Sequence, residues 1–121
     1  MAYIQIFNFS HLMTEEQLDQ IRADYDIDDV RVERIPIQLD LDKPIEQQVQ
    51  PLVIDVLKHS AWADLDAIVL VNPPGFSAAA VLVARELYDS PFVFEFIRLK
   101  RDDSQLPPKW VLAEFFGSPK F

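Results

Sequence analysis

Apolar residues recur along the chain with two different periods, which together predict an α/β fold. Three segments carry apolar side chains at the three- and four-residue spacing of a helix that buries one face. Five shorter segments are continuously apolar or rich in β-branched and aromatic residues, which is typical of strands. The predicted strands are 3–9, 30–39, 67–71, 92–99 and 109–116, and the predicted helices begin at Thr14, Asp42 and about Phe76.

Local signals refine three of these elements. Thr14-Glu15-Glu16-Gln17 has the composition of a capping box, so the first helix begins there. Pro36 cannot donate to a strand ladder, which predicts that the second strand lies at a sheet edge. The phase of the apolar residues changes along this strand and predicts a bulge near Glu33 and Arg34. Pro51 lies inside the second helix and is expected to kink or split it.

The order of the elements predicts a Rossmann-like sheet in a single domain over residues 1–121. Right-handed crossovers make the first four strands parallel. The segment 100–108 is too short and proline-rich for a crossover helix and predicts a final antiparallel hairpin. The strand 67–71 is apolar on both faces and therefore central. The predicted strand order is 2-1-3-4-5, with the topological switch point between the first and third strands.

Two polar turns follow the first and third strands, and this strand order brings them side by side. Ligands of open α/β sheets bind beyond the carboxyl ends of the strands at the switch point, where helix N-termini and free backbone N–H groups gather. Basic residues of the last two strands reach the same edge. The predicted ligand-binding residues are Asn8, Phe9, Ser10, His11, Asn72, Pro73, Pro74, Gly75, Phe76, Ser77, Arg98, Lys100 and Lys109.

Composition narrows the partners and the cellular setting. The formal net charge is −9, with 11 Lys and Arg against 20 Asp and Glu, so the broad basic face that duplex nucleic acid needs is missing. A small anion can still be bound by a helix N-terminus and a few basic side chains. Arg98 and Lys100 either bind phosphate or form only a solvated strand end. The lack of cysteine excludes disulfides and thiol catalysis. No apolar run approaches the ~20 residues of a membrane span, and we expect a cytoplasmic protein.

The turn residues favour binding over catalysis. Asn8 and Asn72 hold neutral amides at strand ends where related folds place carboxylates, so no divalent metal is expected. An amide can read an adenine edge or a phosphate oxygen, although Asn also serves as an ordinary turn cap. Ser10 and His11 are adjacent and lack an evident carboxylate partner. No catalytic triad is therefore predicted, and no catalytic residue or cofactor is assigned.

Four other residues are assigned to packing or capping. The helix from about 76 to 88 has little polar face, so a second subunit is expected to cover it, with Ala79 facing outward. Trp62 and Trp110 are expected in the core or at an interface rather than stacked on a ligand. His59 is expected to cap the end of the second helix.

Several stretches carry a family resemblance. The first is Asn8-Phe9-Ser10-His11 followed by Leu12-Met13-Thr14-Glu15-Glu16-Gln17-Leu18, and the others are Val71-Asn72-Pro73-Pro74, the Ala/Leu/Val helix ending Arg85-Glu86-Leu87, and Ile97-Arg98-Leu99. They resemble a small CRISPR-associated Csx-type family of type III systems, related to the CARF (CRISPR-associated Rossmann fold) sensors. The resemblance spans essentially the whole chain. Met13 departs from it, since a proline is expected before the helix threonine.

The resemblance implies a homodimer that binds a cyclic oligoadenylate, with cyclic tetra-adenylate as the first candidate, over the carboxyl strand edges at the two-fold axis. The favoured expectation is capture of this second messenger, which modulates type III CRISPR antiviral signalling. One alternative is a metal-independent ring nuclease, in which a ribose 2′-hydroxyl attacks the adjacent phosphate with help from Ser10, His11 or Lys100. Another is a structural dimer without ligand. Ring size and assembly beyond a dimer stay open.

Overall fold

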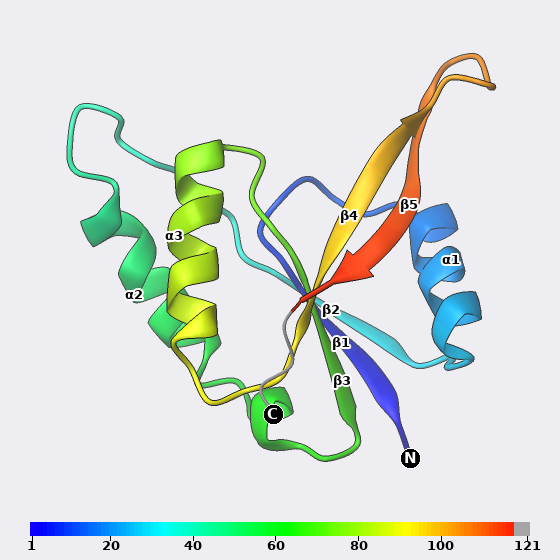
Figure 1. The fold of residues 1–121 in the computed structure, drawn as a ribbon, viewed down its shortest axis with the longest axis horizontal. Coiled ribbons are helices and arrows are strands. Elements are labelled where there is room, and N and C mark those ends of the chain that lie inside the picture. Colours follow the sequence, from blue (N-terminus) through cyan, green and yellow to red (C-terminus); the bar gives the residue numbers. More distant parts are fainter. Residues whose placement is uncertain (118–121) are drawn as a thin grey trace.

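The computed structural model describes residues 1–117, which form one five-stranded sheet with helices on both faces (Figure 1). In chain order the elements are β1 (Tyr3–Asn8), α1 (Glu15–Tyr25), β2 (Val30–Arg34), α2 (Glu46–Val56), the short 3-10 helix η1 (Ser60–Ala63), β3 (Ala67–Asn72), α3 (Ser77–Tyr88), β4 (Glu95–Asp102) and β5 (Lys109–Phe116). α1 covers one face of the sheet, and α2 and α3 lie together on the other (Figure 1). The predicted fold class is confirmed.

The sheet has the predicted topology. Its strand order is β2-β1-β3-β4-β5. β1 pairs in parallel with both β2 and β3, β3 pairs in parallel with β4, and β5 returns antiparallel to β4. Asn8 and Asn72 are partners in the β1–β3 register, so the last residues of these two strands meet. The turns that follow the two strands therefore leave the sheet from adjacent points on its carboxyl edge.

The alternation of side chains along β1 explains why the sheet carries two core layers. Ile6 faces α1 and packs in a buried cluster with Leu18 and Ile21. The next residue, Phe7, faces α2 and α3 and belongs to a second buried cluster with Val53 and other apolar residues. Both faces of the central strands are thus covered, as expected of a parallel sheet. Burying each such side chain contributes about 1.5–3 kcal/mol.

The N-terminus of α1 confirms the predicted capping box and also secures the β5 edge. Thr14 Oγ1 accepts the Gln17 backbone N–H at 3.1 Å, and Gln17 Oε1 accepts the Thr14 N–H at 3.0 Å. The Gln17 Nε2 then donates to the carbonyl of Trp110 at 2.7 Å, while the N–H of Leu112 donates to Gln20 Oε1 at 2.8 Å. α1 therefore fixes the start of β5 beside the carboxyl edge of the sheet.

The second strand lies at a sheet edge as predicted, but it is shorter than predicted. β2 ends at Arg34, whereas the prediction extended it to Leu39. Ile35 still donates its N–H to the carbonyl of Asn8 at 2.8 Å. Pro36 follows and has no N–H, so the ladder stops there.

The fourth strand and the bulge also differ from the prediction. β4 continues past the predicted end at Leu99 to Asp102, because its antiparallel pairing with β5 extends that far. The bulge predicted near Glu33 and Arg34 is wrong, since the register of β2 with β1 is unbroken. The register shift lies instead in the β4–β5 pair, between Arg98 and Leu99.

The second helix begins later than predicted and continues through its proline. Ile45 is the N-cap of α2, and Asp42, the predicted cap, instead donates its backbone N–H to Asp40 Oδ1 in the preceding turn. Pro51 does not split the helix. Pro51 lies on the exposed face, so water can reach the carbonyl that its missing N–H leaves unpaired. The buried apolar stripe on the opposite face keeps the helix against the sheet.

α3 is oriented differently from the expectation. Ala79 is fully buried against the core, so its assignment to an outward position is wrong. Val81 occupies the outward position instead and is 67% exposed. The expected cover of this face by a second subunit stays a prediction. No helix within residues 1–117 is long and apolar enough to cross a membrane.

Two residues assigned to capping or packing have defined places near η1. His59 caps η1 rather than the end of α2, because its Nδ1 accepts the N–H of Ala61 at 3.0 Å. Trp62 is in the core, as expected, and its ring is stacked parallel on Phe7 with centroids 5.2 Å apart.

Candidate functional site

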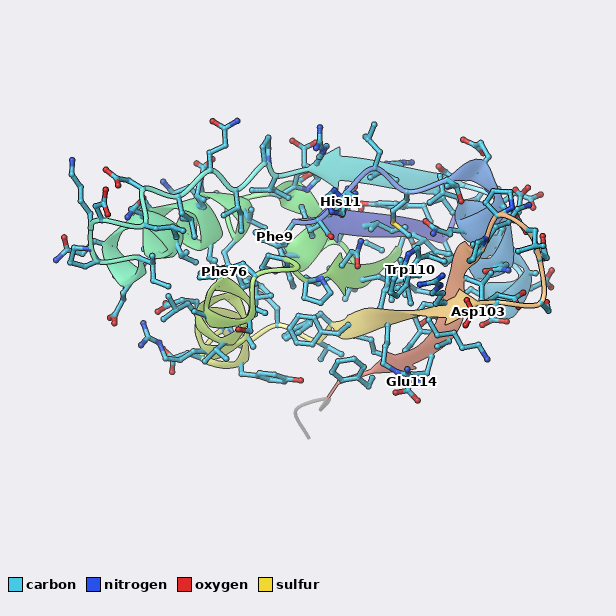
Figure 2. All side chains as sticks on the ribbon, turned by 90° about the horizontal axis from the view of Figure 1, so that it is seen from above. Phe9, His11, Phe76, Asp103, Trp110 and Glu114 are labelled. Atoms are coloured by element: carbon cyan, nitrogen blue, oxygen red, sulfur yellow. The ribbon has the colours of Figure 1, made fainter. Side chains whose placement is uncertain are left out.

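A cavity of about 690 Å³ opens at the carboxyl edge of the sheet, where β1 and β3 end. Figure 2 looks down on this edge, over which the side chains of His11 and Trp110 lie. Its walls come from the β1–α1 turn, the start of α1, the β3–α3 turn, β4 and the start of β5. The lining residues are Ser10, His11, Leu12, Thr14, Glu16, Gln17, Asn72, Pro73, Gly75, Ile97, Arg98, Leu99, Pro108, Lys109 and Trp110.

The fold brings together part of the predicted site. The predicted residues that line the cavity are Ser10, His11, Asn72, Pro73, Gly75, Arg98 and Lys109. Those that do not line it are Asn8, Phe9, Pro74, Phe76, Ser77 and Lys100. Three of the latter are buried beneath the turns, namely Asn8, Phe9 and Pro74. Phe76 and Ser77 are exposed at the start of α3, and Lys100 lines a separate hollow beside Gln20 and Arg101.

Asn8 holds the two turns to each other. Its side-chain oxygen accepts the N–H of Ser10 at 3.0 Å and the Nδ2 group of Asn72 at 3.0 Å. Its own Nδ2 donates to the carbonyl of His11 at 2.9 Å. Asn8 is only 1% exposed, so these bonds replace water completely. Both polar atoms of its amide are engaged within the protein, which makes this side chain a structural bridge.

Asn72 is engaged on one side only. It is 6% exposed and lines the cavity. One N–H of its Nδ2 donates to Asn8, and within residues 1–117 its Oδ1 has no hydrogen-bond partner. Within residues 1–117 every side-chain N or O atom that is fully buried has a hydrogen-bond partner, so this Oδ1 is accessible from the cavity and water can reach it. The Asn72 amide therefore offers an acceptor and one further N–H to whatever occupies the cavity.

The cationic side chains of the cavity are each balanced by a carboxylate. Arg98 Nε contacts Glu114 Oε1 at 2.9 Å, across the β4–β5 hairpin. Lys109 Nζ contacts Glu16 Oε2 at 3.2 Å, between β5 and the first turn of α1. All four side chains are about half exposed, so each pair contributes only about 0–1 kcal/mol. An incoming anion can displace either carboxylate at small cost.

Lys100, which was grouped with these cations, lies in a different electrostatic setting. It is beside Asp102, and hydrogen bonds from the hydroxyl and backbone N–H of Ser104 hold the pKa of that carboxyl below its usual value. Asp102 therefore stays ionised across the neutral range and offsets the charge of Lys100. Lys100 adds little positive field to the cavity.

Sequence reasoning missed the apolar half of the cavity. The walls include Leu12, Ile97, Leu99, Pro108 and Trp110. Trp110 is 59% exposed, so it does not lie in the core, and its expected alternative, a place at an interface, stays a prediction. The sequence held one signal for its place in the cavity. Trp110 directly follows Lys109 at the start of the last strand, and that strand begins at the ligand-binding edge.

The turn after β3 leaves room for close approach. In the described part of the chain, a Cβ added to Gly75 would meet no atom within 4 Å, so the backbone borders open space there. Phe76 is the N-cap of α3 and makes no side-chain cap, and among residues 1–117 the first N–H groups of that helix have no side-chain acceptor. Within residues 1–117, no group of three or more His, Asp or Glu side chains is arranged to hold a metal ion.

Comparison with known proteins adds no relative. No protein-family model matches the chain, and no curated protein or solved structure matches it. The resemblance to the CRISPR-associated Csx-type family therefore stays a prediction. The chemistry of the cavity has to carry any assignment of function.

Proposed function

We propose that the protein binds a cyclic oligoadenylate, with cyclic tetra-adenylate as the first candidate, in the cavity at the carboxyl edge of the sheet. In this proposal two copies hold one ring and sequester it, which lowers the free concentration of a second messenger of type III CRISPR signalling. The observation that carries the proposal is the amide of Asn72, which is bonded to Asn8 on one side and open on the other to a cavity with largely apolar walls.

An adenine base matches the polar and apolar features of the cavity. The free Oδ1 and the second N–H of Asn72 form a donor–acceptor pair, which is the arrangement that reads the N6 and N7 edge of adenine. The exposed ring of Trp110 provides a flat surface on which a base can stack, a contact worth about 1–3 kcal/mol in other proteins. Ile97 and Leu99 supply apolar contacts to the faces of the base.

The phosphates of such a ring have local partners despite the net charge of −9. Arg98 and Lys109 line the cavity, and their carboxylate partners are exposed and weakly held. Salt screens the long-range repulsion of the acidic surface within ~8 Å at physiological ionic strength. Charge-assisted hydrogen bonds are worth about 1.5–3 kcal/mol each, so two of them outweigh that repulsion.

A two-fold arrangement of copies would suit both the ring and the surface around the cavity. A two-fold axis duplicates each turn, as a ring with repeated adenines and phosphates requires. Leu12 and Trp110 at the mouth are 74% and 59% exposed, and Phe76 at the start of α3 is 46% exposed. A second copy placed over this edge would cover these apolar side chains.

Capture is favoured over cleavage by the surroundings of Ser10 and His11. Both residues line the cavity, yet within residues 1–117 neither side chain has a hydrogen-bond or ion-pair partner that would activate it. Efficient attack of a ribose 2′-hydroxyl on the adjacent phosphate calls for in-line positioning and a poised acid or base. The ring nuclease therefore stays the second candidate.

Incubation with purified cyclic tetra-adenylate tests the proposal. We expect a mobility shift and recovery of the intact ring, with linear tetra-adenylate and AMP as matched controls that bind more weakly. Linear products would instead support the ring nuclease. No shift and no products would leave only the structural dimer.

The dimer component has its own test at the outward face of α3. Glu in place of the exposed Val81 should weaken self-association, measured by analytical ultracentrifugation. Val93→Glu is the matched control, since Val93 is 57% exposed outside the helices. Equal association of the two variants would place the interface elsewhere.

A further inference from the structure

The backbone groups at one edge of the sheet are bonded to a helix, whereas those at the other edge are not. At the β5 edge, Gln17 and Gln20 of α1 bond to the outward backbone groups of Trp110 and Leu112. At the β2 edge no such cover occurs within residues 1–117: β2 has a neighbouring strand on one side only. An uncovered edge offers a row of N–H and C=O groups to another strand.

The register of β2 shows which backbone groups are free. Ile4 donates its N–H to the carbonyl of Asp29, and Ile35 donates its N–H to the carbonyl of Asn8. Since parallel ladders use alternate residues, Arg31 and Glu33 direct their backbone groups to β1. The backbone groups of Val30, Val32 and Arg34 therefore point away from the sheet.

The charges along β2 are complementary to themselves. The strand reads Val30-Arg31-Val32-Glu33-Arg34. If a second copy lies antiparallel with Val32 opposite Val32, then Arg31 lies opposite Glu33 and Glu33 lies opposite Arg31. These two residues are neighbours on one face of the sheet, and both are exposed. Opposite charges directly across an antiparallel pair are stabilising, whereas like charges are destabilising.

The free backbone groups of β2 favour the same antiparallel register, with Val32 opposite Val32. With Val32 opposite itself, the two Val32 residues exchange N–H and C=O bonds, and Val30 does so with Arg34 at each end, giving about six hydrogen bonds. Val32 is 41% exposed on the α1 face, so the two valines would also bury each other. A shift by one residue would align bonded with unbonded groups and lose the pairing.

We propose that β2 pairs antiparallel with β2 of a second copy of this chain, about a two-fold axis at Val32, so that one sheet continues through both copies. The proposal does not rest on the proposed ligand, because no residue of β2 lines the cavity. It also uses a different surface from the outward face of α3, so each contact can be lost while the other persists.

Charge exchange on β2 tests the pairing. Arg31→Glu and Glu33→Arg each place like charges opposite one another. In the Val81→Glu background, where the α3 contact is weakened, each should raise the dissociation constant of the homodimer about tenfold or more. The double variant R31E/E33R should restore wild-type association. A mixture of the two single variants should form heterodimers of twice the 14.0 kDa chain mass, because opposite charges then face each other. Unchanged association of the single variants, or no recovery in the double variant and the mixture, would overturn the pairing.

A second variant guards against loss of folding, since Arg31 also contacts Asp29 at 2.9 Å and stacks on the Tyr3 ring at 3.8 Å. Val32→Pro removes an outward N–H only, which an edge strand tolerates, so the fold should persist while the pairing is lost. In the wild type, amide exchange at Val30, Val32 and Arg34 should slow as protein concentration rises. Exchange that is independent of concentration would exclude the pairing, whatever happens at α3.

Discussion

Asn8 and Asn72 are the same residue type at the same point of two adjacent strands, yet the structure uses them differently. They are partners in the β1–β3 register, and both are almost completely buried. Asn8 has both polar atoms engaged, by Ser10, His11 and Asn72. Asn72 lines the cavity with one side of its amide unused. Residue type and register do not decide function here; the decisive property is the hydrogen-bonding capacity that remains after folding.

The asymmetry has a simple structural origin. The turn after β1 doubles back over its own strand end, so that the backbone of Ser10 and His11 comes within reach of Asn8. The turn after β3 contains Pro73 and Pro74. Two successive prolines remove two backbone donors, so Asn72 has fewer local partners. It is left with Asn8 on one side and the cavity on the other.

The largest expected effect is on stability and belongs to Asn8. Asn8→Ala leaves the Nδ2 of Asn72, the N–H of Ser10 and the carbonyl of His11 without their partner. We expect the free energy of unfolding in urea to fall by about 2–4 kcal/mol, since each buried unpaired group costs about 1–3 kcal/mol and the turn groups can recover water. Asn72→Ala, which breaks one of these bonds, should cost clearly less. Equal losses would remove the distinction between the two residues.

The next effect is on ligand affinity and belongs to Asn72. Asn72→Ala should weaken binding of cyclic tetra-adenylate by about ten- to a hundredfold, because the base loses the paired acceptor and donor. Calorimetric titration of the folded variant measures this change. Unchanged affinity would assign Asn72, like Asn8, to holding the turns.

A smaller effect of opposite sign should come from the carboxylates that balance the cavity cations. Glu114→Gln and Glu16→Gln free Arg98 and Lys109, so each should tighten binding severalfold. Arg98→Ala and Lys109→Ala are the matched changes and should weaken binding and flatten its dependence on salt. If both members of a pair alter affinity in the same direction, phosphates do not contact that cation.

The smallest effect is expected at Lys100. It lines a different hollow from the cavity, and so Lys100→Ala should change the affinity for the ring by less than about twofold, as expected of screened surface charge. Lys109→Ala provides the comparison in the same titration. A loss at Lys100 that matches the loss at Lys109 would mean that the bound ring extends beyond the cavity.

Much of the fold could be predicted from the sequence because local and global signals agree. The apolar run of β3 marks a central strand, Pro36 marks an edge strand, and the short segment before β5 forces a hairpin. These constraints are sufficient to order the strands and to bring the two turns together. The capping box at Thr14 was equally readable, since it depends only on residues four apart or closer.

The rest depends on contacts between distant parts of the chain. The direction of Ala79 could not be fixed by a helix that is apolar nearly all round, and the packing of α3 against the sheet decides it. The ion pairs of Arg98 and Lys109 join separate elements, so sequence counted these cations as free. The position of Trp110 also depends on a contact between distant parts of the chain, because Gln17 of α1 bonds to its backbone carbonyl at the start of β5.

Side-chain amide resonances of Asn8 and Asn72 provide the most direct test of the distinction between the two residues and of the site together. In a proton–nitrogen correlation spectrum, titration with cyclic tetra-adenylate should move the Asn72 side-chain amide strongly and the Asn8 amide much less. That result would put the ligand at the open side of Asn72, with the bridge of Asn8 intact. A ring that binds without moving the Asn72 amide, or that moves the two amides equally, would contradict the proposed site.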